Sequence, residues 1–186
     1  MVKKIAIGIL AYNEEMHIES VLNEILTLNR DVYVLNDSST DRTIDILEEL
    51  NTTKNFTIIN NIKNEGAGNS TLKIIERAKN DGFEFVIKVD GDSQFKLDDI
   101  NKIINLYEDK NYDFIKSNRF WENGIEGKIP RNRYFGNLFA TIMLQFISGT
   151  NKLFDPLNGL FGTNVKVLNY INKKVYPKRY GYPFYF

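Results

Sequence analysis

The sequence predicts an α/β fold, with a mostly parallel, Rossmann-like sheet and helices on both faces. Up to residue 95, short runs of β-branched residues alternate with longer segments whose apolar residues recur at helical spacing. A polar cluster follows most of the β-branched runs, as expected where a buried strand ends in a loop. Because strand–helix–strand connections are right-handed, such strands lie parallel and end along one edge of the sheet.

The expected elements follow in chain order. Strands are predicted at residues 4–10, 32–35, 56–60, 83–89 and 114–117, and helices at 14–28, 41–50, from the loop 64–68 to about 80, 97–110 and 133–147. The first helix shows its pattern most clearly, with apolar residues at Ile18, Val21, Leu22, Ile25 and Leu26. Beyond residue 95 the alternation breaks, and glycine, proline and aromatic residues mix.

Composition excludes several classes of protein. The 186 residues carry 24 basic and 24 acidic side chains, so no global charge attracts the chain to nucleic acid. The absence of cysteine excludes disulfides, thiolate metal sites and a cysteine nucleophile. The apolar stretch 134–147 is shorter than the roughly 20 residues that span a bilayer, and the N-terminal apolar run is too short for a signal peptide. We therefore expect one domain over residues 1–186, without a transmembrane helix.

The segment Asp90-Gly91-Asp92-Ser93-Gln94 directly follows the strand predicted at 83–89. Two carboxylates two residues apart can both reach one hard divalent cation, and Gln94 can add a neutral oxygen. Such a site neutralises a diphosphate leaving group. A polar turn at a strand end would use the same residue types without any ligand, so the motif alone leaves both readings open. Lys88 is either an ion-pair partner of this pair or a strand-edge residue.

Other polar clusters are expected at the same edge. The Tyr12 ring can stack on a base, Glu14 can accept from a ribose or base edge, and Asp37 can accept from a base N–H. The same clusters also suit helix starts and turns, with Asn13 as an N-cap. The loop 64–69 lacks both the full Gly-x-Gly-x-x-Gly spacing and a Walker lysine.

Together these motifs resemble the family 2 glycosyltransferases of GT-A fold. The resemblance covers residues 3 to about 165 and rests on segments 5–15, 34–43, 64–68 and 89–94 in that order. It implies an inverting, metal-dependent transfer of a sugar from a nucleotide-diphosphate sugar. It implies nucleotide binding by Ala11, Tyr12, Glu14, Asp37, Gly68 and Asp90, a Mg²⁺ or Mn²⁺ site at Asp90, Asp92 and Gln94, and catalytic roles for Asp92 and Asp155.

Segments 131–137 and 155–159 look like the polyprenyl-phosphate branch of that family. This likeness implies that the acceptor phosphate is held by Arg119, Arg131, Arg133 and Asn137. Residues 1–95 would then be the nucleotide-sugar half and 96–186 the acceptor half of a cytoplasmic enzyme at the inner face of a membrane, serving cell-envelope glycan synthesis. Asn36 replaces the family's usual first Asp, no arginine follows Phe161, and the chain stops before the family's next acidic residue, so we expect truncation at the C-terminus.

Two alternatives remain on the sequence, and two other classes are disfavoured. The acceptor can be a saccharide hydroxyl, which would require a base such as Asp155. The chain can also be a nucleotide-sugar-binding module without turnover. A nucleotidyltransferase would carry a glycine-rich phosphate loop with a basic residue after the first strand, whereas residues 11–15 are acidic. No Gly-x-Gly-x-x-Gly follows that strand, which argues against a dinucleotide oxidoreductase.

Overall fold

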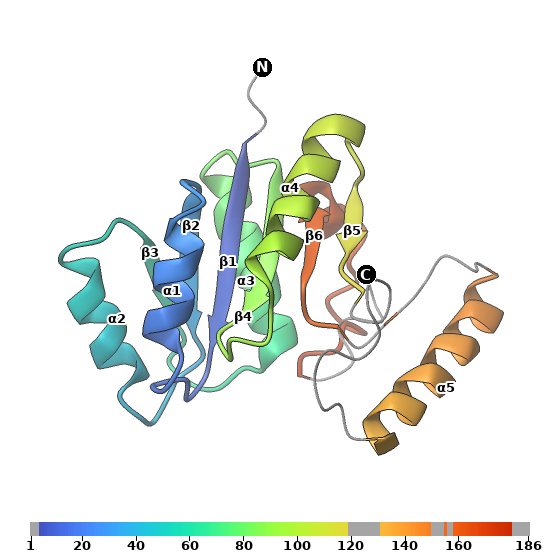
Figure 1. Ribbon diagram of the computed structural model, residues 1–186, viewed down its shortest axis with the longest axis horizontal. Helices are drawn as coiled ribbons and strands as arrows, with labels where there is room; N and C mark the ends of the chain where they lie inside the picture. The colour runs from blue at the N-terminus through green and yellow to red at the C-terminus, as the bar shows by residue number, and fades with distance from the viewer. Residues whose placement is uncertain (1–3, 119–130, 150–154, 156–157, 180–186) are drawn as a thin grey trace.

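A computed structural model describes residues 4–118, 131–149, 155 and 158–179 (Figure 1). Six strands form one sheet in the order β3-β2-β1-β4-β6-β5. The strands are β1 (Ile5–Ala11), β2 (Asp31–Asn36), β3 (Thr57–Asn60), β4 (Phe85–Asp90), β5 (Phe114–Lys116) and β6 (Phe161–Asn164). The pairs among β1 to β4 are parallel, whereas β6 runs antiparallel to both β4 and β5. This confirms the predicted mostly parallel α/β fold.

Helices cover both faces of the sheet (Figure 1). The helices α1 (Ile18–Leu26), α2 (Thr43–Asn51) and α4 (Leu97–Lys110) pack on one face, and α3 (Ala67–Asn80) with the 3₁₀ helix η1 (Val165–Asn169) packs on the other. In β1, Ile5, Ile7 and Ile9 join the first layer, while Ala6 and Leu10 join the second. Successive side chains of a strand point to opposite faces, so burial on both faces explains the continuous apolar run of β1.

Two features differ from the sequence predictions. α1 begins at Ile18 and not at residue 14, because residues 15–17 form a turn in which His17 N donates to Glu14 O at 2.9 Å. β6 and η1 were not predicted. β6 has only four residues, one of them glycine, and this is too short for a period-2 pattern to stand out.

α5 (Arg131–Ser148) lies apart from the sheet in Figure 1. Its half-buried side is formed by Ala140, Thr141, Leu144 and Gln145. The opposite side exposes six large apolar side chains, namely Leu138, Phe139, Ile142, Met143, Phe146 and Ile147. Among the described helices, including α5, none combines the length and apolarity needed to cross a membrane.

The parallel register brings the carboxyl ends of the strands together. Ala11 of β1 pairs with Asn36 of β2, which in turn pairs with Asn60 of β3. On the other side of β1, Leu10 pairs with Asp90 of β4. The loops that leave β1, β2 and β4 therefore start at one edge of the sheet, which is where open α/β sheets bind ligands.

Candidate functional site

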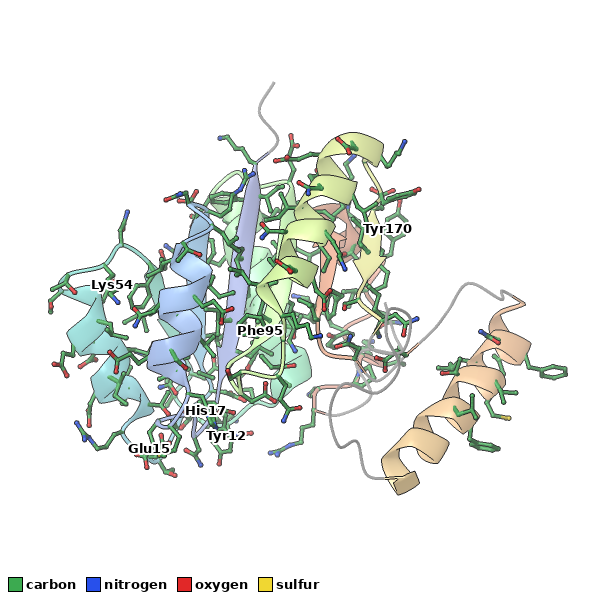
Figure 2. All side chains as sticks on the ribbon, viewed as in Figure 1. Tyr12, Glu15, His17, Lys54, Phe95 and Tyr170 are labelled. Carbon is green, nitrogen blue, oxygen red and sulfur yellow. The ribbon has the colours of Figure 1, made fainter. Side chains whose placement is uncertain are left out.

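A cavity of about 450 Å³ opens at this edge of the sheet. Its walls come from the ends of β1, β2 and β4, the start of α3 and one residue near the C-terminal end of the described chain. The lining residues are Leu10, Ala11, Tyr12, Glu14, Asp37, Asn64, Gly66, Ala67, Ser70, Asp90, Gly91, Asp92 and Arg179. Tyr12 lies at the end of β1 with nearly half of its surface exposed, so its ring is accessible to a ligand (Figure 2).

The loops after β1 and β2 are tied to each other by hydrogen bonds. Asn13 N donates to Ser39 Oγ at 3.0 Å, and Thr40 N donates to Asn13 Oδ1 at 2.8 Å. Glu14 N donates to Thr43 Oγ1 at 2.8 Å. Asn13 therefore bridges two loops, and its predicted role as the N-cap of the first helix is wrong. These bonds hold the backbone of residues 12–14 against the wall formed by the loop after β2.

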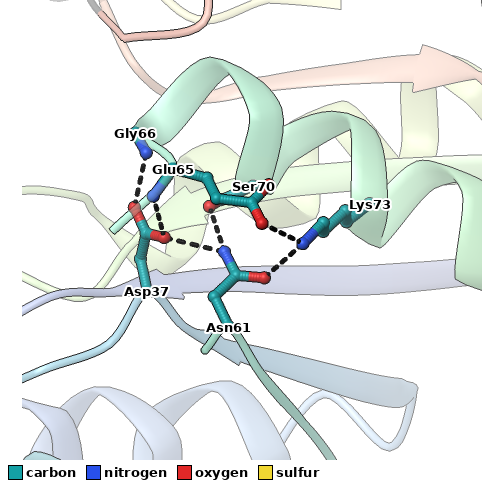
Figure 3. A network of polar contacts seen from close by, with 6 residues as sticks. All are labelled: Asp37, Asn61, Glu65, Gly66, Ser70 and Lys73. Atoms are coloured by element: carbon teal, nitrogen blue, oxygen red, sulfur yellow. Dashed lines mark hydrogen bonds and ion pairs between the residues drawn. The ribbon is translucent and has the colours of Figure 1, made fainter. Parts of the chain in front are cut away.

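Asp37 is the centre of a buried polar network (Figure 3). Its Oδ1 accepts from Asn61 Nδ2 at 2.7 Å and from Glu65 N at 2.9 Å, while its Oδ2 accepts from Gly66 N at 2.8 Å. Lys73 Nζ donates to both Asn61 Oδ1 and Glu65 Oε1, at 2.6 and 2.8 Å. The carboxylate therefore fixes the loop that starts α3 and also faces the cavity.

These contacts leave the Asp37 carboxylate few free lone-pair positions with which to bind a ligand. A carboxylate offers about four lone-pair positions. The three protein donors occupy both positions of Oδ1 and one of Oδ2. Within the described part of the chain, Asp37 thus retains one acceptor position, on Oδ2, for a donor group in the cavity.

Asp90 is held on two sides. Lys88, whose side chain is almost fully buried, forms an ion pair with Asp90 Oδ1. Asp90 Oδ2 lies so close to Gly159 that a β-carbon at that position would overlap it. The ion-pair alternative predicted for Lys88 is therefore the one that the structure adopts, and the glycine of the segment 155–159 is required by close approach to Asp90.

Acidic side chains gather at the β4 end of the cavity. Burial, followed by the negative charges of Asp92 and, more weakly, Asp90, raises the pKa of Glu14 above its ordinary value. Asp92 is half-buried, and its Oδ1 accepts from Gln94 N at 3.1 Å. A bound cation would relieve the repulsion among these carboxylates, so the donor set is compatible with Mg²⁺ or Mn²⁺.

The metal, if bound, would not be enclosed by protein alone. Over residues 4–118 and the described later segments, no three histidine, cysteine, aspartate or glutamate side chains are grouped to hold a metal ion. Mg²⁺ typically binds through one or two carboxylates together with substrate phosphates and water. Asp92, with Asp90 beside it, suits that arrangement.

Six of the predicted donor-site residues line one cavity: Ala11, Tyr12, Glu14, Asp37, Asp90 and Asp92. Gly68, Gln94 and Asp155 are not in its lining. Gly68 is covered by the backbone of residues 177–178, a placement that does not match its predicted contact with a nucleotide. Gln94 is exposed, whereas Asp155 is buried in a turn where Asn158 N donates to Asp155 O at 3.1 Å.

The residues predicted to bind the acceptor phosphate belong to a different part of the chain. Arg119 lies outside the described residues. Arg131, Arg133 and Asn137 belong to the first two turns of α5, but their side chains lie outside the description. Their role in binding a phosphate therefore stays a prediction.

Sequence reasoning missed several lining residues. Asn64, Gly66, Ala67 and Ser70 come from the loop 64–69 and the start of α3, where the incomplete glycine spacing concealed a site built on Asp37. Arg179 was missed altogether because no motif surrounds it. Its position in the cavity depends on a long-range contact between the C-terminal region and α3.

Comparison with known proteins agrees with the fold and the motifs. Residues 6–171 match Glycosyl transferase family 2. The uncharacterised protein MJ0544 of Methanocaldococcus jannaschii is 35% identical over 136 residues, which are 72% of this chain and 57% of that protein. A UDP-N-acetylglucosamine–dolichyl-phosphate N-acetylglucosaminyltransferase of Methanococcus voltae is 28% identical over 193 residues, covering 96% of this chain and 76% of that enzyme.

Solved structures give the same fold at low sequence identity. Glucosyl-3-phosphoglycerate synthase from Mycobacterium tuberculosis, in complex with Mn²⁺, UDP-glucose and phosphoglyceric acid, aligns with a TM-score of 0.74 at 18% identity, over 98% of this chain and 63% of that one. S. aureus TarS 1–349 aligns with a TM-score of 0.65 at 18% identity, over 97% and 53%. The chain thus spans little more than half the length of the M. jannaschii and S. aureus proteins. With a family match over most of its length and a GT-A sheet, the chain belongs to glycosyltransferase family 2.

Proposed function

We propose that this chain binds a uridine-diphosphate sugar and transfers the sugar, with inversion, to a polyprenyl phosphate. The observation that carries this proposal is the cavity itself. It places the single open acceptor position of Asp37 and the carboxylates of Asp90 and Asp92 in one lining. A nucleoside diphosphate carries matching groups, with a base N–H at one end and a charged diphosphate at the other.

Asp37 supports uracil as the base. The uracil edge presents one N–H, at N3, which needs one acceptor position. Guanine presents N1–H and N2–H₂ side by side and would be read best by both oxygens of a carboxylate. Because both Oδ1 positions are already taken by Asn61 and Glu65, Asp37 suits the single N–H of uracil. The M. voltae relative is named for a UDP-sugar donor, which agrees with this choice.

Asp92 and Asp90 are proposed to act at the diphosphate. A divalent metal bound there would offset the negative charge that develops on the departing nucleoside diphosphate. Asp92 offers Oδ2 for such an ion, while Lys88 holds Asp90 in place. Most of the rate enhancement would then come from positioning and electrostatics.

The burial of Asp155 supports a phosphate acceptor. A hydroxyl acceptor needs a base within hydrogen-bond reach, and Asp155 is 1% exposed and does not line the cavity. A phosphate monoester is ionised near neutral pH and can attack the anomeric carbon without such a base. The dolichyl-phosphate acceptor in the name of the M. voltae relative points to the same class.

The apolar face of α5 supports an acceptor carried by a membrane. Six large apolar residues, Leu138, Phe139, Ile142, Met143, Phe146 and Ile147, face solvent, and residues 134–149 contain no charged side chain. Exposing such a face to water is unfavourable by about 25 cal/mol per Å² of apolar surface. We propose that this face lies on the bilayer that holds the acceptor.

Phe139→Ser/Phe146→Ser is therefore expected to reduce binding to phospholipid vesicles at least tenfold, because two of the most exposed apolar side chains of α5 are lost. Co-sedimentation with vesicles measures this binding. Ile62→Ser is the matched control, since it removes a fully exposed apolar side chain far from α5 in the sequence. Equal vesicle binding by the double variant and the wild type would reject α5 as the contact.

The proposed function is tested by incubating the chain with UDP-sugars and Mn²⁺, with either a polyprenyl phosphate or a free saccharide as acceptor. We expect sugar transfer to the lipid phosphate, detected as a labelled glycolipid. Transfer to the saccharide alone would replace the lipid acceptor by a hydroxyl acceptor. Binding of UDP-sugar without transfer or hydrolysis would identify a binding module without turnover.

A further inference from the structure

The last described segment crosses the start of α3. Residues 172–179, here named the C-terminal strap, bind α3 at several points, including hydrogen bonds to Gly68 and Asn69 in its first turn. Asn69 N donates to Lys178 O at 3.0 Å, and the buried Tyr176 donates through Oη to Gly68 O at 3.3 Å. The strap thus packs on the first turn of α3, which directly follows the residues that Asp37 binds.

The two glycines of the loop 64–68 make this packing possible. A β-carbon on Gly68 would overlap the carbonyl oxygen of Pro177, and one on Gly66 would meet the side chain of Arg179. Gly66 also has a positive φ of 87°, which glycine adopts without strain. The two glycines of this loop therefore leave room for the strap.

Docking of the strap places Arg179 in the wall of the donor cavity. Its side chain lies against Gly66, whose N–H binds Asp37 Oδ2 at 2.8 Å, so Arg179 stands at the Asp37 end of the cavity. Among the described residues, no hydrogen bond or ion pair satisfies its guanidinium. Asn64 Oδ1, in the same wall, is buried and also lacks a partner in the described chain. Arg179 is exposed to solvent, whereas Asn64 Oδ1 is buried. Because buried polar groups are otherwise paired, the unpartnered Asn64 Oδ1 in the same wall as Arg179 indicates a ligand there.

We propose that Arg179 reads the base of the donor. Its guanidinium donates to a uracil carbonyl oxygen, while Asp37 Oδ2 accepts the adjacent N3–H. This inference rests on the proposed uridine donor. An acceptor beside a planar donor matches the alternating N–H and C=O groups of the uracil edge. The strap is then a part of the donor site, and its arginine contributes to base selection.

The test compares uridine, UMP and UDP without metal, by NMR or calorimetric titration, for the wild type, Arg179→Ala and Lys178→Ala. Lys178→Ala is the matched control because it removes an exposed neighbouring cation while its backbone carbonyl still binds Asn69. A lost charge-assisted hydrogen bond is expected to weaken all three ligands by a similar factor, about tenfold to a hundredfold. Lys178→Ala should leave their affinities unchanged.

Two results would overturn the inference. In the first, Arg179→Ala lowers the affinity for UDP but not for uridine, which would make Arg179 a phosphate contact. In the second, Arg179→Ala leaves the affinities for all three ligands unchanged. If the wild type binds another nucleotide and no uridine nucleotide, the proposed donor fails separately. If Arg179→Ala then lowered the affinity for that nucleotide and for its nucleoside by the same factor, base reading by Arg179 would still be supported. Because Arg179 is exposed, its replacement should leave the unfolding temperature unchanged, and this separates lost binding from lost fold.

Discussion

Asp92→Asn is expected to abolish the metal dependence of nucleoside-diphosphate binding and to lower sugar transfer by about a hundredfold or more. The substitution keeps the size of the side chain and an oxygen that can still accept from Gln94 N. It removes the negative charge that a divalent cation requires. Calorimetric titration of UDP with and without Mn²⁺ measures the first effect, and transfer of labelled sugar measures the second.

Asp98→Asn is the matched control for this experiment. Asp98 is an exposed carboxylate in the first turn of α4, six positions further along the chain, and it does not line the cavity. It undergoes the same chemical change without any expected effect on UDP. If Mn²⁺ strengthened UDP binding to Asp92→Asn as much as to the wild type, Asp92 would not be the metal ligand.

The position of Asp92 could be predicted from the sequence because it depends on local pattern. The β-branched run before it predicts a buried strand, and the parallel arrangement sends the end of that strand to the ligand-binding edge. The same reasoning placed Tyr12, Glu14 and Asp37 at that edge, and all of them line the cavity. The sequence thus predicted the position of these residues in the fold, while their roles in binding stay predictions.

Residues brought to the cavity by tertiary contacts could not be predicted in this way. Arg179 reaches it because Tyr176 and Lys178 bind α3, more than a hundred residues earlier in the chain. Gly68 was assigned to nucleotide, yet its missing side chain makes room for Pro177. A glycine in a loop looks the same in sequence whether a ligand or another segment of the chain lies against it.

Asp37 illustrates both cases, because the strand before it predicts its position but not its partners. Its donors Asn61, Glu65 and Gly66 come from the segment between β3 and α3, and nothing local links that segment to β2. Asp37 therefore both shapes the site and is proposed to bind the base. Its removal should affect stability and affinity together.

Asp37→Ala is expected to lower the free energy of unfolding by about 3 kcal/mol and to abolish measurable uridine binding. The substitution leaves the buried N–H of Gly66 and the half-buried N–H of Glu65 without their acceptor, and hydrogen bonds to a charged group are worth about 1.5–3 kcal/mol each. Asn61 Nδ2 keeps its bond to Ser70 Oγ, which limits the loss. Urea denaturation measures the stability, and titration with UDP well below the unfolding midpoint measures binding by the folded fraction.

Glu48→Ala is the appropriate comparison, since Glu48 is an exposed carboxylate on α2 and its loss should change the stability by less than about 0.5 kcal/mol. The two effects of Asp37→Ala can be separated with Asp37→Asn, which keeps one acceptor oxygen but puts an amide among N–H donors. We expect an intermediate loss of stability and the same loss of uridine binding, because the amide side chain must turn its oxygen to the backbone N–H groups. If Asp37→Asn bound UDP like the wild type, Asp37 would support the loop without reading the base.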